Sequence, residues 1–251
     1  MNNLVRISTN QSQKLGNLLH TLRPHTEDFL DPLLFPSQEY NNEDIARFFF
    51  FVTSIDHRTS PRGKSFEGIV KDGYFQGADL LWHLSLRKFQ QNPINFHPEE
   101  MVKITSTQIR RWYTVTEPNR VTISNPAERA TLLRDCGQQL RNNYSSSVLE
   151  LLAAAQHRIL PDQDIGTLGL LKLLSEFKAY EDPTRKKSFL FLKFILRRNL
   201  WSHTDTNNIR IPVDNHLTRI ALRTGIVKVS PNFAKILRQR IPLTLRRDVE
   251  L

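Results

Sequence analysis

The feature that most constrains the fold of this chain is a run of four phenylalanines, Phe48–Phe51, inside a predicted helix. Asn41 and the acids that follow it are suitable residues for the start of that helix. Four consecutive residues on an α-helix point in all directions, so this helix has no polar face to present to water. We therefore expect it to be buried among other elements and to end at the polar loop 54–61.

The remaining periodicity is also mostly helical, so the predicted fold class is mainly α. One β-hairpin is expected over residues 66–75, because Asp72 and Gly73 suit its turn. Residues 1–40 are polar and interrupted by prolines, which predicts an N-terminal arm. Residues 41–251 are predicted to form a single catalytic domain, whose C-terminal lobe, residues 183–247, is basic.

The bulk composition excludes several classes of protein. No run of the 251 residues approaches the roughly 18 apolar residues that a membrane helix needs. The N-terminus lacks the long apolar stretch of a signal peptide, so we expect a cytoplasmic location and no membrane partner. Cys136 is the single cysteine of the sequence, which excludes an internal disulfide and a cysteine-based metal cluster. We expect a monomer with no metal and no cofactor.

The positive charge is concentrated near the C-terminus. Residues 183–247 contain fifteen Lys and Arg against Asp205 and Asp214, a net +13, whereas the whole chain carries +10. The remainder is therefore −3. A basic region joined to a near-neutral body is typical of a protein that binds a polyanion. A solvated basic surface without a partner is the alternative.

Asp214 stands where an extended Ile-Pro-Val segment passes into an amphipathic helix. Its simplest role is to cap that helix. The residues around it are cationic or can become so, which suggests an anionic ligand at the helix start: Arg210, His216, Arg219 and Arg223. Asp205 is the alternative carboxylate in the basic region.

The segment from Val213 to Val227 resembles the catalytic segment of the helix-hairpin-helix DNA glycosylases. The aspartate, the histidine, two arginines and the glycine match that motif in spacing. This resemblance implies a two-lobed helical fold, with Asp214 as the catalytic carboxylate. The glycine hairpin and the lysine of the bifunctional members have no counterpart over residues 180–188, so we expect a monofunctional hydrolase.

A second resemblance covers more of the chain, from about Phe48 to Val227, and is to the queuosine salvage nucleosidases. Its matching segments are 51–53, 77–89, 104–110, 128–133, 187–189 and the Asp214 helix. In that family an aromatic-rich stretch follows the first segment and holds the base. Here the polar residues 56–61 replace it, which implies a base with more groups to hydrogen-bond.

Both resemblances imply cleavage of an N-glycosidic bond, in which a carboxylate stabilises an oxocarbenium-like sugar. The main hypothesis is a DNA glycosylase that binds duplex DNA with a flipped nucleotide and releases a modified or damaged base. A bulky phage-type base would give it a role in antiviral defence. The alternatives are a queuosine-type nucleosidase and a non-enzymatic nucleic-acid-binding module.

The candidate residues fall into three groups. Asp214 is the candidate catalytic residue. The candidates for the base pocket are Asp56, His57, Asp79, Trp82 and Trp201. The candidates for DNA contacts are Lys187, Lys193, Arg197, Arg198, Arg210, His216 and Arg219. The competing interpretation for Asp79 is a role at the start of a helix. For the two tryptophans it is a place in the hydrophobic core.

Overall fold

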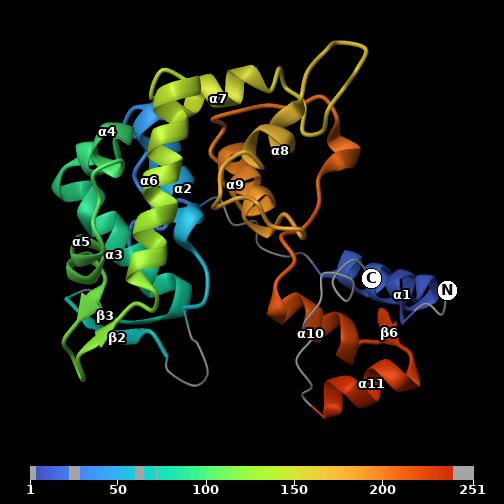
Figure 1. The fold of residues 1–251 in the computed structure, drawn as a ribbon. Helices are drawn as coiled ribbons and strands as arrows, with labels where there is room; N and C mark the ends of the chain where they lie inside the picture. The colour runs from blue at the N-terminus through green and yellow to red at the C-terminus, as the bar shows by residue number, and fades with distance from the viewer. Residues whose placement is uncertain (1–3, 23–28, 60–64, 72, 240–251) are drawn as a thin grey trace. The chain divides into compact units, whose positions relative to one another are not determined.

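The computed structural model describes residues 4–22, 29–59, 65–71 and 73–239 (Figure 1). It is mainly helical with a few short antiparallel strand pairs, as the sequence predicts. Contacts divide the chain into a large unit, Glu27–Pro212, and a small unit, Met1–Thr26 with Val213–Leu251. The predicted arm of residues 1–40 and the single domain of residues 41–251 stay predictions. Parts of the predicted loop, turn and basic lobe lie outside the described residues, namely residues 60, 61, 72 and 240–247.

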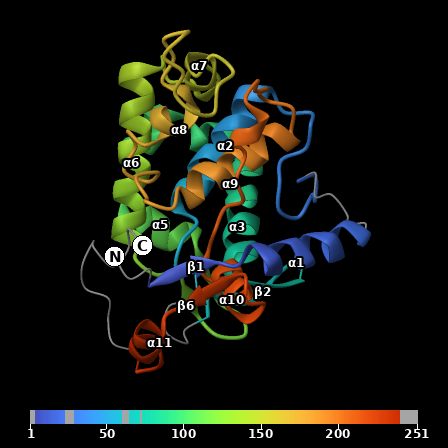
Figure 2. The same cartoon turned by 90° about the vertical axis from the view of Figure 1, so that its right-hand side faces the viewer.

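Helix α2 (Asn42–Ile55) lies at the centre of the large unit, between α9 and α6 (Figures 1 and 2). Asn41 caps it by accepting a hydrogen bond from the backbone N–H of Asp44 at 2.8 Å. All four phenylalanines of Phe48–Phe51 are fully buried, and Phe49 stacks on Phe194 with ring centroids 4.7 Å apart. The burial predicted for this helix is confirmed.

The rest of the large unit is mostly helical, as the predicted fold class requires. Its elements besides α2 are β2 (Glu67–Val70), β3 (Gly73–Gln76), α3 (Gly77–Gln91), the 3-10 turn η2 (Pro93–Phe96), α4 (Pro98–Met101), α5 (Ser106–Trp112), β4 (Thr114–Val115), β5 (Val121–Thr122), α6 (Pro126–Asn143), α7 (Val148–Ala154), α8 (Gly169–Leu174), α9 (Lys186–Arg197) and the 3-10 turn η3 (Thr206–Asn208). Helix α8 starts only at Gly169, because Asp162 and Thr167 pair backbone to backbone and close a turn before it.

The predicted hairpin is present as β2 and β3, and two further strand pairs accompany it. The N–H of Ile69 donates to the carbonyl of Glu117 at 2.7 Å and joins the hairpin to the loop between β4 and β5. Gly68 permits this approach, since a Cβ at that position would lie 2.5 Å from Cγ2 of Val115. Strands of two to four residues leave little periodicity in a sequence.

The small unit joins the two ends of the chain. Strand β1 (Val5–Ile7) pairs antiparallel with β6 (Val227–Val229). Its helices are α1 (Thr9–Thr21), α10 (Asn215–Arg223) and α11 (Pro231–Arg238). The side-chain amide of Gln11 also donates to the carbonyl of Thr224 at 3.1 Å. Among the described residues, no helix has both the length and the apolar character to cross a membrane.

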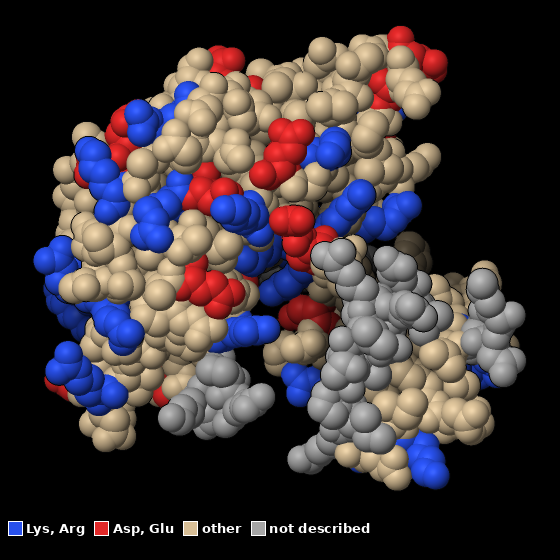
Figure 3. All heavy atoms as spheres, viewed as in Figure 1, with Lys and Arg blue, Asp and Glu red and all other residues tan. Residues whose placement is uncertain are grey.

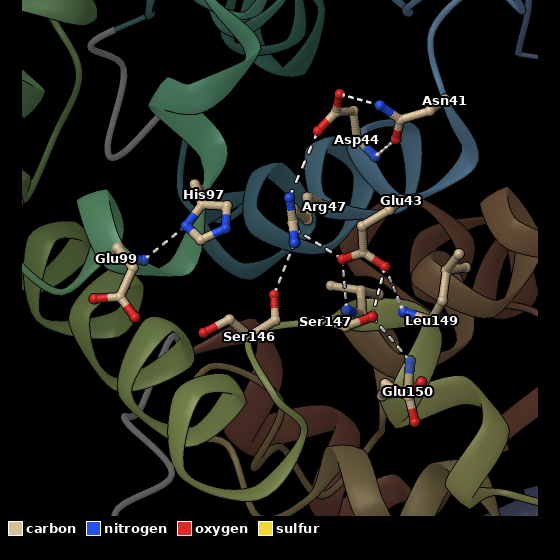
Figure 4. A network of polar contacts seen from close by, with 11 residues as sticks. Asn41, Glu43, Asp44, Arg47, His97, Glu99, Ser146, Ser147, Leu149 and Glu150 are labelled. Atoms are coloured by element: carbon tan, nitrogen blue, oxygen red, sulfur yellow. Dashed lines mark hydrogen bonds and ion pairs between the residues drawn. The ribbon is translucent and has the colours of Figure 1, made fainter.

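Glu43 on α2 holds the start of α7 through its carboxylate (Figure 4). The carboxylate accepts from the hydroxyl of Ser147 and from the N–H groups of Val148 and Leu149, at 2.7–3.0 Å. Arg47 pairs with the same carboxylate at 2.8 Å. One acid therefore satisfies the free amides of a helix start and fixes α7 on the buried helix.

Replacing Glu43 by Gln should lower the free energy of unfolding of the large unit by about 2 kcal/mol, because hydrogen bonds to an ionised acceptor are the strong ones. Urea unfolding followed by tryptophan fluorescence measures this. The matched control is Glu100→Gln, which breaks an exposed ion pair with Lys103 and should cost less than about 1 kcal/mol. Equal losses in the two variants would contradict this role of Glu43.

Candidate functional site

Asp214 is the N-cap residue of α10, as the sequence predicts. Its backbone is extended, and its Oδ1 accepts hydrogen bonds from the N–H groups of His216 and Leu217, both at 2.9 Å. Both cap bonds use the same oxygen. Within the part of the chain that the structure describes, Oδ2 accepts no hydrogen bond. The carboxylate is thus fixed by one oxygen while the other is available.

The cations on α10 are on its surface. His216 and Arg219 are both exposed, and a guanidinium nitrogen of Arg219 lies 3.2 Å from Nδ1 of His216. Nε of Arg219 donates to the carbonyl of Asn215 at 3.1 Å. Within the described ranges Asp214 forms no ion pair with an arginine. Among the described residues, its orientation is therefore set by the two hydrogen bonds at the helix start.

A polar cluster closes the C-terminal end of α2. We call it the Asp56 cluster, and it consists of Asp56, His57, Trp82, Arg129 and Lys187. The last carbonyls of a helix have no partner inside it and attract cations. Lys187 donates to the carbonyl of Ser54 at 2.5 Å, and the fully buried Arg129 donates to the carbonyls of Ile55 and His57.

Asp56 supplies the negative charge of this cluster. It is only 8% exposed, and its Oδ2 accepts from Nε1 of Trp82 at 3.4 Å. Burial lowers the pKa of Arg129 to about 10, and the charge of Asp56 works against that shift. On α3, loss of hydration raises the pKa of Asp79, and repulsion from Asp56 and Asp31 raises it further.

His57 is held neutral in this environment. Burial, followed by the charges of Lys187 and Arg129, lowers its pKa to about 2. Nζ of Lys187 lies 3.3 Å from Nδ1 of His57, which places the acceptor nitrogen toward the ammonium and the ring proton on Nε2. Oε1 of Glu128 lies 3.6 Å from that Nε2. Burial lowers the pKa of Lys187 itself to about 8.

The structure thus brings together four predicted site residues from distant parts of the chain, namely Asp56, His57, Trp82 and Lys187. Trp201 lies elsewhere in the large unit. Its Nε1 donates to the carbonyl of Leu152 at 3.0 Å, and its ring stacks with His157. Its place in a base pocket stays a prediction.

Two other charged residues of the basic region are buried and form hydrogen bonds with backbone groups. Arg198 is 8% exposed, donates to the carbonyl of Phe29 at 2.9 Å and lies over the ring of Phe49. The carboxylate of Asp205 accepts from the N–H groups of Ile159 and Leu160. Burial opposes ionisation of Asp205, but these bonds and one from Asn208 lower its pKa. Asp205 therefore organises a loop.

A groove of about 490 Å³ lies between α9 and residues 209–212. Six apolar residues and three cationic residues line it, namely Phe189, Leu192, Lys193, Leu196, Arg197, Ile209, Arg210, Ile211 and Pro212. Lys193, Arg197 and Arg210 are exposed there. We call this the α9 groove. Its cations could hold an anionic group while its apolar floor contacts a less polar part of a ligand.

Arg129 was not among the residues predicted from the sequence, although it organises the Asp56 cluster. A signal for it exists in the spacing of α6. It falls on the buried stripe of that helix with Ala130, Leu133 and Leu140. A cation on an apolar helix face predicts a buried hydrogen-bonded partner, because an unpaired buried charge is costly.

Within the described ranges no group of His, Cys, Asp and Glu could hold a metal ion.

Comparison with known families matches residues 37–251 to the queuosine salvage protein family. The chain belongs to this family. A similar curated protein is the queuosine 5′-phosphate N-glycosylase/hydrolase of Dictyostelium discoideum, which is 20% identical over 166 residues. That alignment covers 64% of this chain and 50% of the relative, so the chain spans about half the relative's length. The comparisons support the resemblance to queuosine salvage nucleosidases and give no support to that with helix-hairpin-helix DNA glycosylases.

The neutral state of His57 predicts a pH dependence of stability. Its pKa is about 2 in the folded chain against an ordinary value of 6.5. Between these values only the unfolded chain binds the proton, so stability falls as the pH falls below 6.5. From pH 6 to pH 5 the wild type should lose about 1 kcal/mol more than His57→Gln in urea unfolding. Equal losses would show that His57 is not held neutral.

Proposed function

We propose that this protein is an N-glycosidase that hydrolyses the bond between base and sugar in a queuosine-type nucleotide. The observation that carries this proposal is the family match over residues 37–251, which includes Asp214 and the whole Asp56 cluster. The relative from Dictyostelium discoideum is named for the same reaction on queuosine 5′-phosphate. The DNA glycosylase hypothesis has no such support.

Asp214 is the proposed catalytic carboxylate. Breaking an N-glycosidic bond leaves positive charge on the sugar, and a fixed carboxylate stabilises that charge and orients the attacking water. Oδ1 is held by two backbone N–H groups, whereas Oδ2 accepts no hydrogen bond from the described residues and is the oxygen proposed for this role. Partial positive charge at the start of α10 favours the ionised carboxylate. The capping bonds thus prepare the residue for catalysis.

A phosphate on the substrate suits the α9 groove. Lys193, Arg197 and Arg210 line it beside apolar side chains, a combination that fits a phosphate joined to a less polar group. Lys187 and Arg198, which the sequence suggested as DNA contacts, instead donate to carbonyls inside the large unit. The charge available for docking a duplex is therefore smaller than the +13 of the linear sequence suggests.

The Asp56 cluster is the proposed site of base recognition. The carboxylate of Asp56 accepts a hydrogen bond from Trp82, and a neutral His57 carries a proton on Nε2, a buried nitrogen without a hydrogen-bond partner among the described residues. This pair suits a base that carries hydroxyl or amino substituents. Asp79 and Trp82, both on α3, lie near Asp56 and complete the set of residues proposed to recognise the base.

Asp214→Asn should lower kcat for base release from queuosine 5′-phosphate at least about 100-fold. Asn caps a helix as well as Asp does, so the melting temperature should stay within about 2 °C of the wild type. Mass spectrometry of the released base measures the rate. Asp214→Ala is the companion variant, and it should also lose about 1 kcal/mol of stability through the missing cap. An active Asp214→Asn would reduce Asp214 to a capping residue.

The DNA glycosylase hypothesis is tested with duplexes that contain uracil, 8-oxoguanine or glucosylated hydroxymethylcytosine. We expect no base release from any of them under conditions in which the free nucleotide is hydrolysed. Exposed His216 and Arg219 on α10 are the residues that favour DNA contact. Release from a duplex that is abolished by Asp214→Asn would restore the DNA hypothesis. Binding without release from any substrate would favour a nucleic-acid-binding module.

A further inference from the structure

A second hollow with the chemistry of an anion site lies on the large unit, on α5 and the β4–β5 hairpin. It has a volume of about 490 Å³ and is lined by three arginines and three threonines, namely Thr107, Arg110, Arg111, Thr114, Arg120 and Thr122. We call it the arginine pocket. None of these residues belongs to the Asp56 cluster, the α9 groove or the Asp214 helix.

Two elements converge to build this pocket. Thr107, Arg110 and Arg111 follow the three- and four-residue spacing of one face of α5, and Thr114 is the first residue of β4. Arg120 directly precedes β5, and Thr122 is the last residue of that strand. The hydroxyl of Thr114 donates to the carbonyl of Arg110 at 2.6 Å and lies 2.7 Å from the hydroxyl of Thr122, which ties α5 to the hairpin. The arginines are therefore positioned from both sides of the hollow.

The charges in this pocket have no counter-charge within the described part of the chain. Arg110, Arg111 and Arg120 are exposed, form no ion pair and donate no hydrogen bond there. The lining holds no carboxylate. Lys88 and Arg87 of α3 add to the same field, since burial and then Arg111 and Arg87 lower the pKa of Lys88. Figure 3 shows Lys and Arg side chains gathered over α5.

A purely structural role explains only part of this arrangement. Arg110 and Arg111 lie in the last turn of α5, where cations favour the helix dipole. Arg120 is outside any helix and gains nothing from that dipole. It lines the same hollow as two other guanidinium groups, and a bound anion would relieve the repulsion among these like charges. Guanidinium groups bind phosphate through paired N–H donors, and threonine hydroxyls donate to the remaining oxygens.

We propose that the arginine pocket binds a phosphate group of a ligand other than the hydrolysed nucleotide. The phosphate can belong to a free phosphorylated metabolite or to the backbone of a single-stranded RNA, and both present the same oxygens. Arg110 and Arg120 hold it from the two elements, with Arg111 adding charge. This site is independent of base release, because no residue of the proposed catalytic machinery lines it.

The test uses the full chain and isothermal titration calorimetry with two probes, pyrophosphate and a twelve-nucleotide single-stranded RNA. Arg110→Gln with Arg120→Gln should weaken binding at least about tenfold, in line with the loss of two charge-assisted contacts. The control pair is Arg141→Gln with Lys103→Gln, which removes the same charge from exposed ion pairs elsewhere. It should change binding less than about twofold.

The two probes separate the sources of the phosphate. Binding of pyrophosphate alone supports a free metabolite, and tighter binding of the RNA supports a nucleic-acid backbone. No binding of either probe overturns the proposal. Equal weakening in the two double variants also overturns it, because the attraction would then be a general effect of surface charge. Circular dichroism verifies that all variants are folded, and base release is not used as a readout.

Discussion

The arrangement of the large unit depends on the burial of α2 on all sides. A helix with no face toward water must have its terminal carbonyls satisfied by other parts of the protein. Arg129 and Lys187 do this, and their charges are thereby brought into the interior. Asp56 offsets these charges, and His57 beside them is kept neutral. The polar cluster is a consequence of burying four phenylalanines in one helix.

Capping and chemistry are compatible roles for Asp214. The two cap bonds go to one carboxylate oxygen, which fixes the plane and direction of the group without using the other oxygen. A catalytic group needs this kind of fixed orientation, since reorganisation during the reaction is costly. The helix start therefore supplies both local stability and a positioned carboxylate from a single residue.

The distribution of charge shows how far a count along the sequence can mislead. Of the basic region, Lys187 and Arg198 serve carbonyls of the interior, whereas Lys193, Arg197 and Arg210 line the α9 groove. The arginine pocket lies outside that region, in the part of the chain with a slightly negative net charge. Net charge sums over residues that the fold separates, so only the structure shows which cations face solvent together.

The sequence by itself determined the helices, the burial of Phe48–Phe51 and the capping position of Asp214, because caps and periodicity act over one or two turns. It also carried the motifs that relate the chain to queuosine salvage. Only the tertiary structure decided that Lys187 reaches Ser54, that Arg129 closes α2 and that β1 pairs with β6. These contacts join residues that are far apart along the chain. Local patterns do not encode them, because they arise when buried polar groups find partners in the packed fold.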